Sequence, residues 1–270
     1  VHNVKGYLMQ KVVNFIMNLR TTSHAFFLSR HGQSEYNNLG RIGGDSGLSP
    51  EGVKYAQKLA EFVERKINKD ASGREVPTRL WTSSMRRTKE TTQFIAQKKV
   101  LIKDECDQDY EWIQMRPRAW HHLDELFAGT CDGMTYEEIE ATYPEEWGRR
   151  QGDKLAYRYP RGESYLDVIA RLEPIIIEME RHQEPLLIVA HQGILRIIYA
   201  FYMGLGRADA PYVSLKLNTV TELIPAVYGC VQRRHVLHKP SKDFPVDGQA
   251  EPQGGQRRLS IDSIDDQPSH

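Results

Sequence analysis

The sequence predicts an α/β fold with a mostly parallel central sheet. Short apolar runs alternate with amphipathic helical segments, an order typical of strands joined by crossover helices. The run Leu186–Ala190 contains only apolar residues, which indicates a parallel strand buried on both faces. Polar and basic residues follow three of the apolar runs. The ligand crevice of such a sheet lies beyond those strand ends.

The early segments predict a helix, a strand, a loop and a second helix. Residues 1–24 place apolar side chains at helical spacing, as an amphipathic helix does and a targeting signal does not. Residues 25–28 predict a strand, and the glycines within 40–47 predict a loop. Ser49, followed by a proline, supplies the N-cap and N1 residues of a helix that we expect over 50–67.

The later segments continue the alternation of strands and helices. Residues 98–122 show no clear period, so we assign no element to them. The polar tail 239–270 holds a single aromatic residue, so we expect no fixed fold in the tail. Thr135 with Glu138, and Ser164, supply capping residues for two helices. The expected elements are strand 79–82, helix 85–96, helix 135–141, helix 164–182, strand 186–190, helix 193–203 and strands 219–224 and 227–233.

Composition excludes several classes of protein. The 270 residues carry 36 Lys and Arg against 36 Asp and Glu, so we expect neither nucleic acid nor a membrane surface as a partner. The mostly apolar stretch 194–205 contains Arg196 and is too short to span a bilayer. The three cysteines lie far apart without metal-ligand spacing, which favours a cytoplasmic protein without a disulfide scaffold or zinc finger.

Two histidines occupy the same structural context. His31 and His191 each follow an apolar run and precede a glycine within two residues, and Arg87 lies just beyond a third run. One histidine after a strand is more often structural than catalytic, but the repeated context favours a functional site. Imidazole can attack phosphorus, and arginines can hold phosphoryl oxygens. No carboxylate or cysteine stands at ligand spacing, so we expect no metal.

Residues 28–34, Leu-Ser-Arg-His-Gly-Gln-Ser, resemble the signature of the histidine phosphatase (phosphoglycerate mutase-like) superfamily. Stretches at 40–49, 131–139 and 157–165 narrow the resemblance to the fructose-2,6-bisphosphatase domain of bifunctional 6-phosphofructo-2-kinase/fructose-2,6-bisphosphatases. The resemblance runs from about residue 4 to 235. It implies a three-layer sandwich with helices on both faces of the sheet.

The resemblance also implies a domain organisation and an activity. Residues 1–24 would be a helix carried over from an upstream kinase domain, 25–238 the phosphatase domain, and 239–270 a disordered tail. Because the chain does not begin with Met, we interpret its start as a cut inside a longer protein. The activity would be metal-independent hydrolysis of the 2-phosphate of fructose 2,6-bisphosphate through a phosphohistidine, giving fructose 6-phosphate. ATP would serve only the kinase domain, glycolysis would be the regulated pathway, and a homodimer is left open.

The resemblance assigns catalytic roles to named residues. His31 would be the nucleophile, and Arg30, Arg87 and His191 would hold the transferred phosphate. Glu125 would protonate the leaving oxygen and then activate water, with Asp124 as the neighbouring alternative. The residues assigned to the sugar and the 6-phosphate are Asn37, Arg41, Ile42, Gly43, Tyr136, Arg150, Lys154, Arg158, Tyr165 and Gln192.

Several features leave alternatives open. The spacing of Arg150, Lys154 and Arg158 puts three cations on one face if the segment is helical, and a solvated basic face has the same spacing. Gln33 replaces the Glu that is usual in the family, and we interpret it as a loop residue behind the site. Residues 98–122 are longer than the corresponding family loop. They are either a lid or a surface insertion packed by its two tryptophans.

Two further points concern regulation and function. Ser260 follows two arginines, as in substrates of basophilic kinases, although chance basic residues in a tail give the same pattern. A phosphoglycerate mutase or broad-specificity phosphatase is one alternative function. A catalytically silent module that binds sugar phosphates is another. The intact set of His31, Glu125 and His191 with two arginines argues against the silent module.

Overall fold

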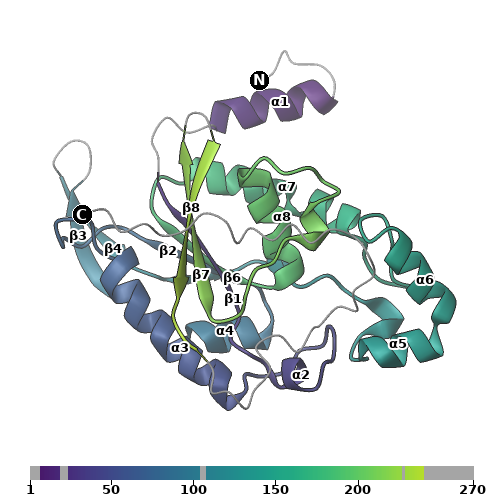
Figure 1. The fold of residues 1–270 in the computed structure, drawn as a ribbon. Helices are drawn as coiled ribbons and strands as arrows, with labels where there is room; N and C mark the ends of the chain where they lie inside the picture. The colour runs from purple at the N-terminus through teal and green to yellow at the C-terminus, as the bar shows by residue number, and fades with distance from the viewer. Residues whose placement is uncertain (1–6, 19–23, 104–107, 227–228, 240–270) are drawn as a thin grey trace, which may run out of the picture.

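The computed structural model describes residues 7–18, 24–103, 108–226 and 229–239. Its main feature is a six-stranded sheet with the strand order β5-β2-β6-β1-β7-β8 (Figure 1). The first four of these strands are mutually parallel, and β7 runs antiparallel to both of its neighbours. The predicted mostly parallel α/β sheet is therefore confirmed. The strands are β1 (Phe26–Arg30), β2 (Arg79–Thr82), β5 (Pro117–Ala119), β6 (Leu186–Ala190), β7 (Thr219–Ala226) and β8 (Gly229–Val236).

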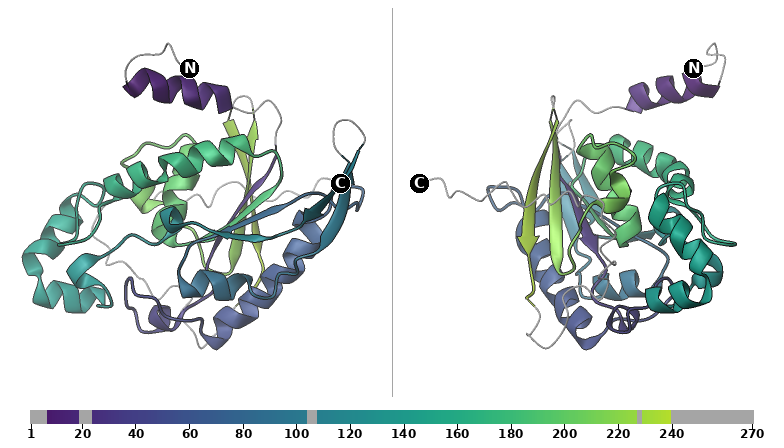
Figure 2. Two further views of the ribbon diagram at one scale, coloured as in Figure 1. Left: turned by 180° about the vertical axis from the view of Figure 1, so that it is seen from behind. Right: turned by 45° about the vertical axis from the view of Figure 1, so that its right-hand side comes forward.

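Helices cover both faces of the sheet, because successive side chains of each buried strand point to opposite faces. Phe26 and Leu28 of β1 pack with α7 (Tyr165–Arg181) and α8 (Gln192–Tyr202) in one core. Phe27, between them, packs with α3 (Pro50–Phe62) in the other core. The predicted three-layer sandwich is confirmed (Figure 2).

A smaller third core lies beside the sheet. It joins α5 (Tyr136–Thr142) and α6 (Pro144–Gly152) to the loop around Ile42. Both views of the ribbon place these two helices to the side of the sheet rather than over it (Figures 1 and 2). The remaining short helices are α2 (Glu35–Asn38) and the 3-10 turns His121–Leu123, Gly129–Cys131 and Ala210–Tyr212.

The predicted caps are present. The Ser49 hydroxyl accepts from Gly52 N at 3.2 Å and begins α3. Thr135 and Glu138 form a reciprocal capping box at the start of α5. Ser164 caps α7 in the same way with Asp167 as its partner. These helix starts were predictable because a cap needs only residues that are three positions apart.

Two helix ends differ from the prediction. The helix expected over 85–96 is α4 (Arg86–Thr92) only. The hydroxyls of Thr91 and Thr92 donate to the carbonyls of Arg87 and Lys89, a local competition that is unfavourable for continuing a helix. The helix expected over 50–67 reaches Phe62 in α-form and ends with a π-helical turn, Val63–Ile67.

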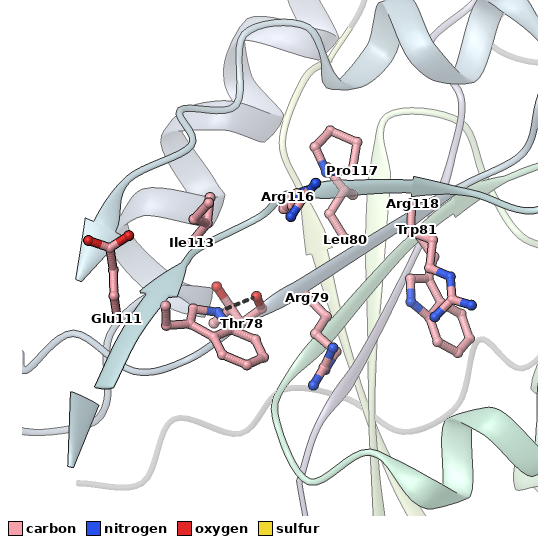
Figure 3. Close-up of a pocket in the computed structure, with 10 residues that line it drawn as sticks. Thr78, Arg79, Leu80, Trp81, Glu111, Ile113, Arg116, Pro117 and Arg118 are labelled. Atoms are coloured by element: carbon pink, nitrogen blue, oxygen red, sulfur yellow. Dashed lines mark hydrogen bonds between the residues drawn. The ribbon is translucent and has the colours of Figure 1, made fainter. Parts of the chain in front are cut away.

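The untyped segment 98–122 is a surface insertion on the edge of the sheet. It contains a hairpin of β3 (Lys99–Lys103) and β4 (Asp109–Ile113), followed by β5. Trp112 donates to the Thr78 carbonyl at 3.1 Å, and Trp120 packs edge-on against Trp81. Figure 3 shows the groove that this insertion forms along the start of β2, the end of that strand remote from His191. The interpretation of an insertion packed by its tryptophans is therefore confirmed.

The predicted N-terminal helix is present as α1 (Tyr7–Asn18), which lies against α7 through an ion pair between Lys11 and Glu173. Its apolar positions Leu8 and Ile16 are 71% and 58% exposed. No helix in the described ranges is long and apolar enough to cross a membrane. The predictions for the tail, including Ser260, concern residues outside those that the structure describes.

Candidate active site

The ends of three parallel strands bring the predicted phosphate-transfer residues together. Arg30 is the last residue of β1, and His31 follows it. His191 follows β6, and Arg87 lies in α4 just beyond β2. All four side chains are at most 4% exposed, and the two imidazole centroids lie 5.2 Å apart. His31 and His191, which are 160 positions apart in the sequence, meet because β1 and β6 are neighbours in the sheet.

The His31 ring is fixed in one tautomer. The backbone N–H of His31 donates to the Ala190 carbonyl, and the ring Nδ1 lies 2.8 Å from the Gly32 carbonyl oxygen. Because a carbonyl can only accept, Nδ1 carries the proton and Nε2 keeps its lone pair. A neutral imidazole with a free Nε2 is a competent nucleophile toward phosphorus.

Close backbone packing explains the glycine after His31. A Cβ atom at Gly32 would lie 2.6 Å from the Gly52 carbonyl oxygen, closer than real Cβ contacts allow. Gly52 itself meets the Gln33 carbonyl in the same way. The Gln33 side chain accepts from the Ser49 hydroxyl at 2.9 Å and is 6% exposed. Gln33 thus ties the loop to the start of α3 from behind the site.

The electrostatic environment keeps both histidines neutral. Burial, followed by the charges of Arg87 and Arg30, holds the pKa of His31 well below 6.5. Burial and Arg87 lower the pKa of His191 in the same direction. At neutral pH the positive charge of this site therefore resides on the two guanidinium groups, and the imidazoles remain unprotonated.

Arg87 connects the site to the glycine-rich loop. Its Nη1 donates to the Gly44 carbonyl at 2.6 Å, and its Nε donates to His191 Nδ1 at 3.2 Å. Arg30 is anchored from the other side, since its Nη1 donates to the Leu215 carbonyl at 3.0 Å. Each guanidinium group is thus held in place by a backbone carbonyl.

The two neighbouring carboxylates occupy different positions. Asp124 accepts the backbone N–H and the hydroxyl of Ser84, each at 2.6 Å. Glu125 is half-buried, and its Oε1 would meet a Cβ built on Gly193, the second residue of α8, at 2.6 Å. Glu125 lines a cavity together with Gln192 and Gly193, the two residues that follow His191, whereas Asp124 is committed to Ser84. The geometry therefore favours Glu125 over Asp124 as the proton donor.

That cavity also collects most of the residues predicted to bind the sugar and the second phosphate. Besides Glu125, the cavity is lined by seven of the predicted binding residues: Ile42, Gly43, Tyr136, Arg150, Lys154, Tyr165 and Gln192. Arg150 and Lys154 are 6% and 7% exposed. Arg150 donates to the phenol oxygens of Tyr159 and Tyr136 and lies 4.9 Å over the Tyr136 ring.

Sequence reasoning missed one cation of this cavity. Arg196 also lines it, is 9% exposed, and donates to the Val213 carbonyl and the Tyr165 hydroxyl. A signal was present, because Arg196 interrupts an otherwise apolar stretch of a helix that is buried on several sides. A lone cation in such a stretch indicates an inward-facing polar partner.

Three predicted binding residues lie elsewhere. Arg158 pairs with Asp167, and its side chain is 63% exposed. The helical face proposed for it does not form, because α6 ends at Gly152. Asn37 accepts from Ser34 as part of the α2 cap. Arg41 donates to the Gly133 carbonyl, so the last two residues shape the glycine-rich loop and are not part of the cavity lining.

The fold and the site define a histidine-centred phosphoryl-transfer protein, and comparison with known families agrees. Residues 26–236 match the model of the histidine phosphatase superfamily (branch 1). The chain belongs to that superfamily. Two solved structures share the fold alone. An α-ribazole phosphatase from Shigella flexneri has a TM-score of 0.63 at 18% identity, covering 80% of this chain and 96% of that one. A mycobacterial glucosyl-3-phosphoglycerate phosphatase has a TM-score of 0.59 at 23% identity, covering 80% of this chain and 98% of that one.

Curated relatives are more similar in sequence. A fructose-2,6-bisphosphatase from Saccharomyces cerevisiae is 43% identical over 229 residues, which are 85% of this chain and 45% of that protein. A 6-phosphofructo-2-kinase/fructose-2,6-bisphosphatase from Arabidopsis thaliana is 41% identical over 88% of this chain and 29% of that protein. The Gallus gallus protein of the same name is 42% identical over 85% of this chain and 43% of that protein. The chain spans half or less of the length of these three relatives.

Proposed function

We propose that this chain hydrolyses the 2-phosphate of fructose 2,6-bisphosphate through a phosphohistidine. The observation that carries the proposal is a buried, neutral His31 that feels the charges of Arg87 and Arg30, together with the cavity that holds Glu125, Arg150 and Lys154. A sugar with two phosphates requires cations at both ends, and the site offers them. The names of the curated relatives and membership of the histidine phosphatase superfamily support the same activity.

In the first step, the Nε2 lone pair of His31 forms a bond to the phosphorus of the 2-phosphate. The bond between that phosphorus and the C2 oxygen breaks, and protonated Glu125 gives its proton to the leaving oxygen. Arg30 and Arg87 offset the charge on the phosphoryl oxygens in the transition state. Fructose 6-phosphate leaves as the alcohol at C2, and the phosphoryl group stays on His31.

In the second step, water replaces the sugar. The Glu125 carboxylate takes a proton from water while the water oxygen bonds to phosphorus. The phosphorus–nitrogen bond breaks, and its electron pair returns to Nε2 of His31. Inorganic phosphate is released, and Glu125 is protonated again for the next cycle.

The wider setting is also part of this proposal. We infer that the domain needs no cofactor or metal, and that residues 1–24 continue from a kinase domain in a longer parent chain. The two functions in the names of the Arabidopsis and Gallus relatives support this arrangement. A cytoplasmic location and a role in the regulation of glycolysis follow from the proposed substrate.

A labelling experiment tests the proposed function. The protein is incubated with fructose 2,6-bisphosphate carrying ³²P in the 2-phosphate, in EDTA, and quenched in alkali, in which phosphohistidine is stable. We expect label on His31, release of phosphate, and loss of both in His31→Ala. Turnover of 3-phosphoglycerate instead would indicate a mutase. Neither label nor turnover would indicate a silent module, and a requirement for Mg²⁺ would contradict the metal-independent mechanism.

A further inference from the structure

A buried chain of hydrogen bonds lies behind His191. His191 Nε2 is 2.8 Å from the Ser83 hydroxyl, which is 2.8 Å from the Thr88 hydroxyl. The Thr88 hydroxyl in turn lies 2.8 Å from the Met85 carbonyl oxygen. On the other side of the ring, His191 Nδ1 accepts from Arg87 Nε. His191, Ser83 and Thr88 have no exposed surface, so water does not replace these partners.

The groups at the two ends of this series of hydrogen bonds, Arg87 and the Met85 carbonyl, fix which atom donates in each bond. A guanidinium can only donate, so His191 Nδ1 must be the acceptor and Nε2 must carry the proton. A backbone carbonyl can only accept, so the Thr88 hydroxyl donates its proton to Met85 O at 2.8 Å, with Ser83 O at 3.2 Å as a second acceptor. The protons therefore run from His191 Nε2 to Ser83, from Ser83 to Thr88, and from Thr88 to Met85.

We propose that Ser83 and Thr88 are positioning residues that hold His191 in the neutral Nε2–H tautomer, and thereby orient Arg87 toward the transferred phosphate. The phosphate-binding role of Arg87 rests on the proposed function. His191 then serves as an acceptor for Arg87, and its tautomer is the opposite of the Nδ1–H form of His31. Two imidazoles in one site are thus set to different tautomers by different partners.

The charges around His191 favour this state. Burial lowers its pKa most, followed by the charged or titratable groups Arg87 in α4, His31 just after β1, Arg30 at the end of β1, and Arg171 in α7. Protonating Nδ1 would set two donors against each other, because Arg87 Nε–H already points there. If the Thr88 hydroxyl is removed, the Ser83 hydroxyl can donate its proton to His191 Nε2. His191 would then carry its own proton on Nδ1, which faces the Nε–H of Arg87.

Three substitutions on one helix separate positioning from general packing. Thr88→Val removes the hydroxyl and keeps the shape of the side chain. Thr88→Ser keeps the hydroxyl and removes a methyl group. Thr92→Val is the matched control, since Thr92 is also buried in α4 but donates to the Lys89 carbonyl and has no bond to the His191 chain. We expect kcat to fall about tenfold in Thr88→Val, and about twofold at most in the other two variants.

Nitrogen-15 NMR of histidine-labelled protein tests the tautomer directly, with signals assigned through His31→Gln and His191→Gln. At pH 7 we expect His191 as Nε2–H and His31 as Nδ1–H in the wild type, Thr88→Ser and Thr92→Val. In Thr88→Val we expect the His191 signal to shift toward the other tautomer. A cationic or Nδ1–H His191 in the wild type, or an unchanged signal in Thr88→Val, would overturn the proposal. These signals do not require turnover, so failure of the proposed function would be seen separately in the labelling experiment.

Discussion

The carboxylate of Asp124 accepts both the backbone N–H and the hydroxyl of Ser84, each at 2.6 Å. This pair ties the loop after β2 to the segment that leads into Glu125. The carboxylate of Glu125 lies instead in the cavity next to Gly193. Two adjacent acids therefore have different surroundings: Asp124 holds a loop, and Glu125 faces the cavity in which we propose that it protonates the leaving oxygen.

Substitution of each acid should separate these tasks. Glu125→Gln removes the transferable proton, so we expect kcat to fall about 10²–10⁴-fold. Asp124→Asn keeps one acceptor for Ser84, and we expect kcat within about tenfold of the wild type, with a loss of about 1–3 kcal/mol in the free energy of unfolding. Turnover assays and urea denaturation measure the two quantities. A larger loss of kcat in Asp124→Asn than in Glu125→Gln would reverse the assignment.

The packing of Gly52 against the loop of His31 gives a second prediction. A Cβ at Gly52 would lie 2.1 Å from the Gln33 carbonyl oxygen, so Gly52→Ala must displace backbone. We expect a loss of about 1–3 kcal/mol in the free energy of unfolding and a lower kcat.

Gly148→Ala is the control for that substitution. Gly148 lies in α6 with open space around its Cα, so alanine should stabilise the helix by about 0.5–1 kcal/mol. Thermal or urea unfolding of both variants checks the contrast. Equal effects at the two positions would contradict the close approach between Gly52 and Gln33.

The lowered pKa of His31 predicts a pH dependence of stability. The unfolded chain takes up a proton at this residue near pH 6.5, whereas the folded protein does so only at lower pH. Stability from this group is therefore full above about pH 6.5 and is lost as the pH falls toward the folded pKa. His31→Gln should reduce the pH dependence of the unfolding free energy by up to about 1.4 kcal/mol per pH unit between pH 6 and pH 5. Parallel curves for the two proteins would contradict a lowered pKa.

The two arginines at 150 and 158 should differ in their effect on substrate binding. Arg150 is buried in the cavity, so Arg150→Gln should raise KM for fructose 2,6-bisphosphate about 10–100-fold through loss of a charge-assisted contact to the 6-phosphate. Arg158 is exposed and paired with Asp167, so Arg158→Gln should change KM by less than about twofold. Steady-state kinetics of both variants test this. A larger effect at Arg158 would place the second phosphate outside the cavity.

Much of the fold was predictable because its signals are local. An N-cap at Ser49, a capping box at Thr135 and a run of apolar residues at 186–190 each depend on residues that are close in sequence. The motif around His31 also predicted that this histidine belongs to the site, where it lies close to His191. The helix over 85–96 was predicted too long, since its threonine hydroxyls compete for backbone acceptors only once the local structure is formed.

The sequence by itself determined the alternation of the main strands and helices, their caps and the residue types of the site, but it did not predict β3, β4, β5 or α6. Only the tertiary structure decided which side chains meet: that Asp124 is committed to Ser84, that Arg196 joins the cavity, and that Arg158 does not. The physical reason is that a hydrogen bond or ion pair depends on distance in space. Which residues come within that distance is set by the order of the strands in the sheet and by where each helix ends.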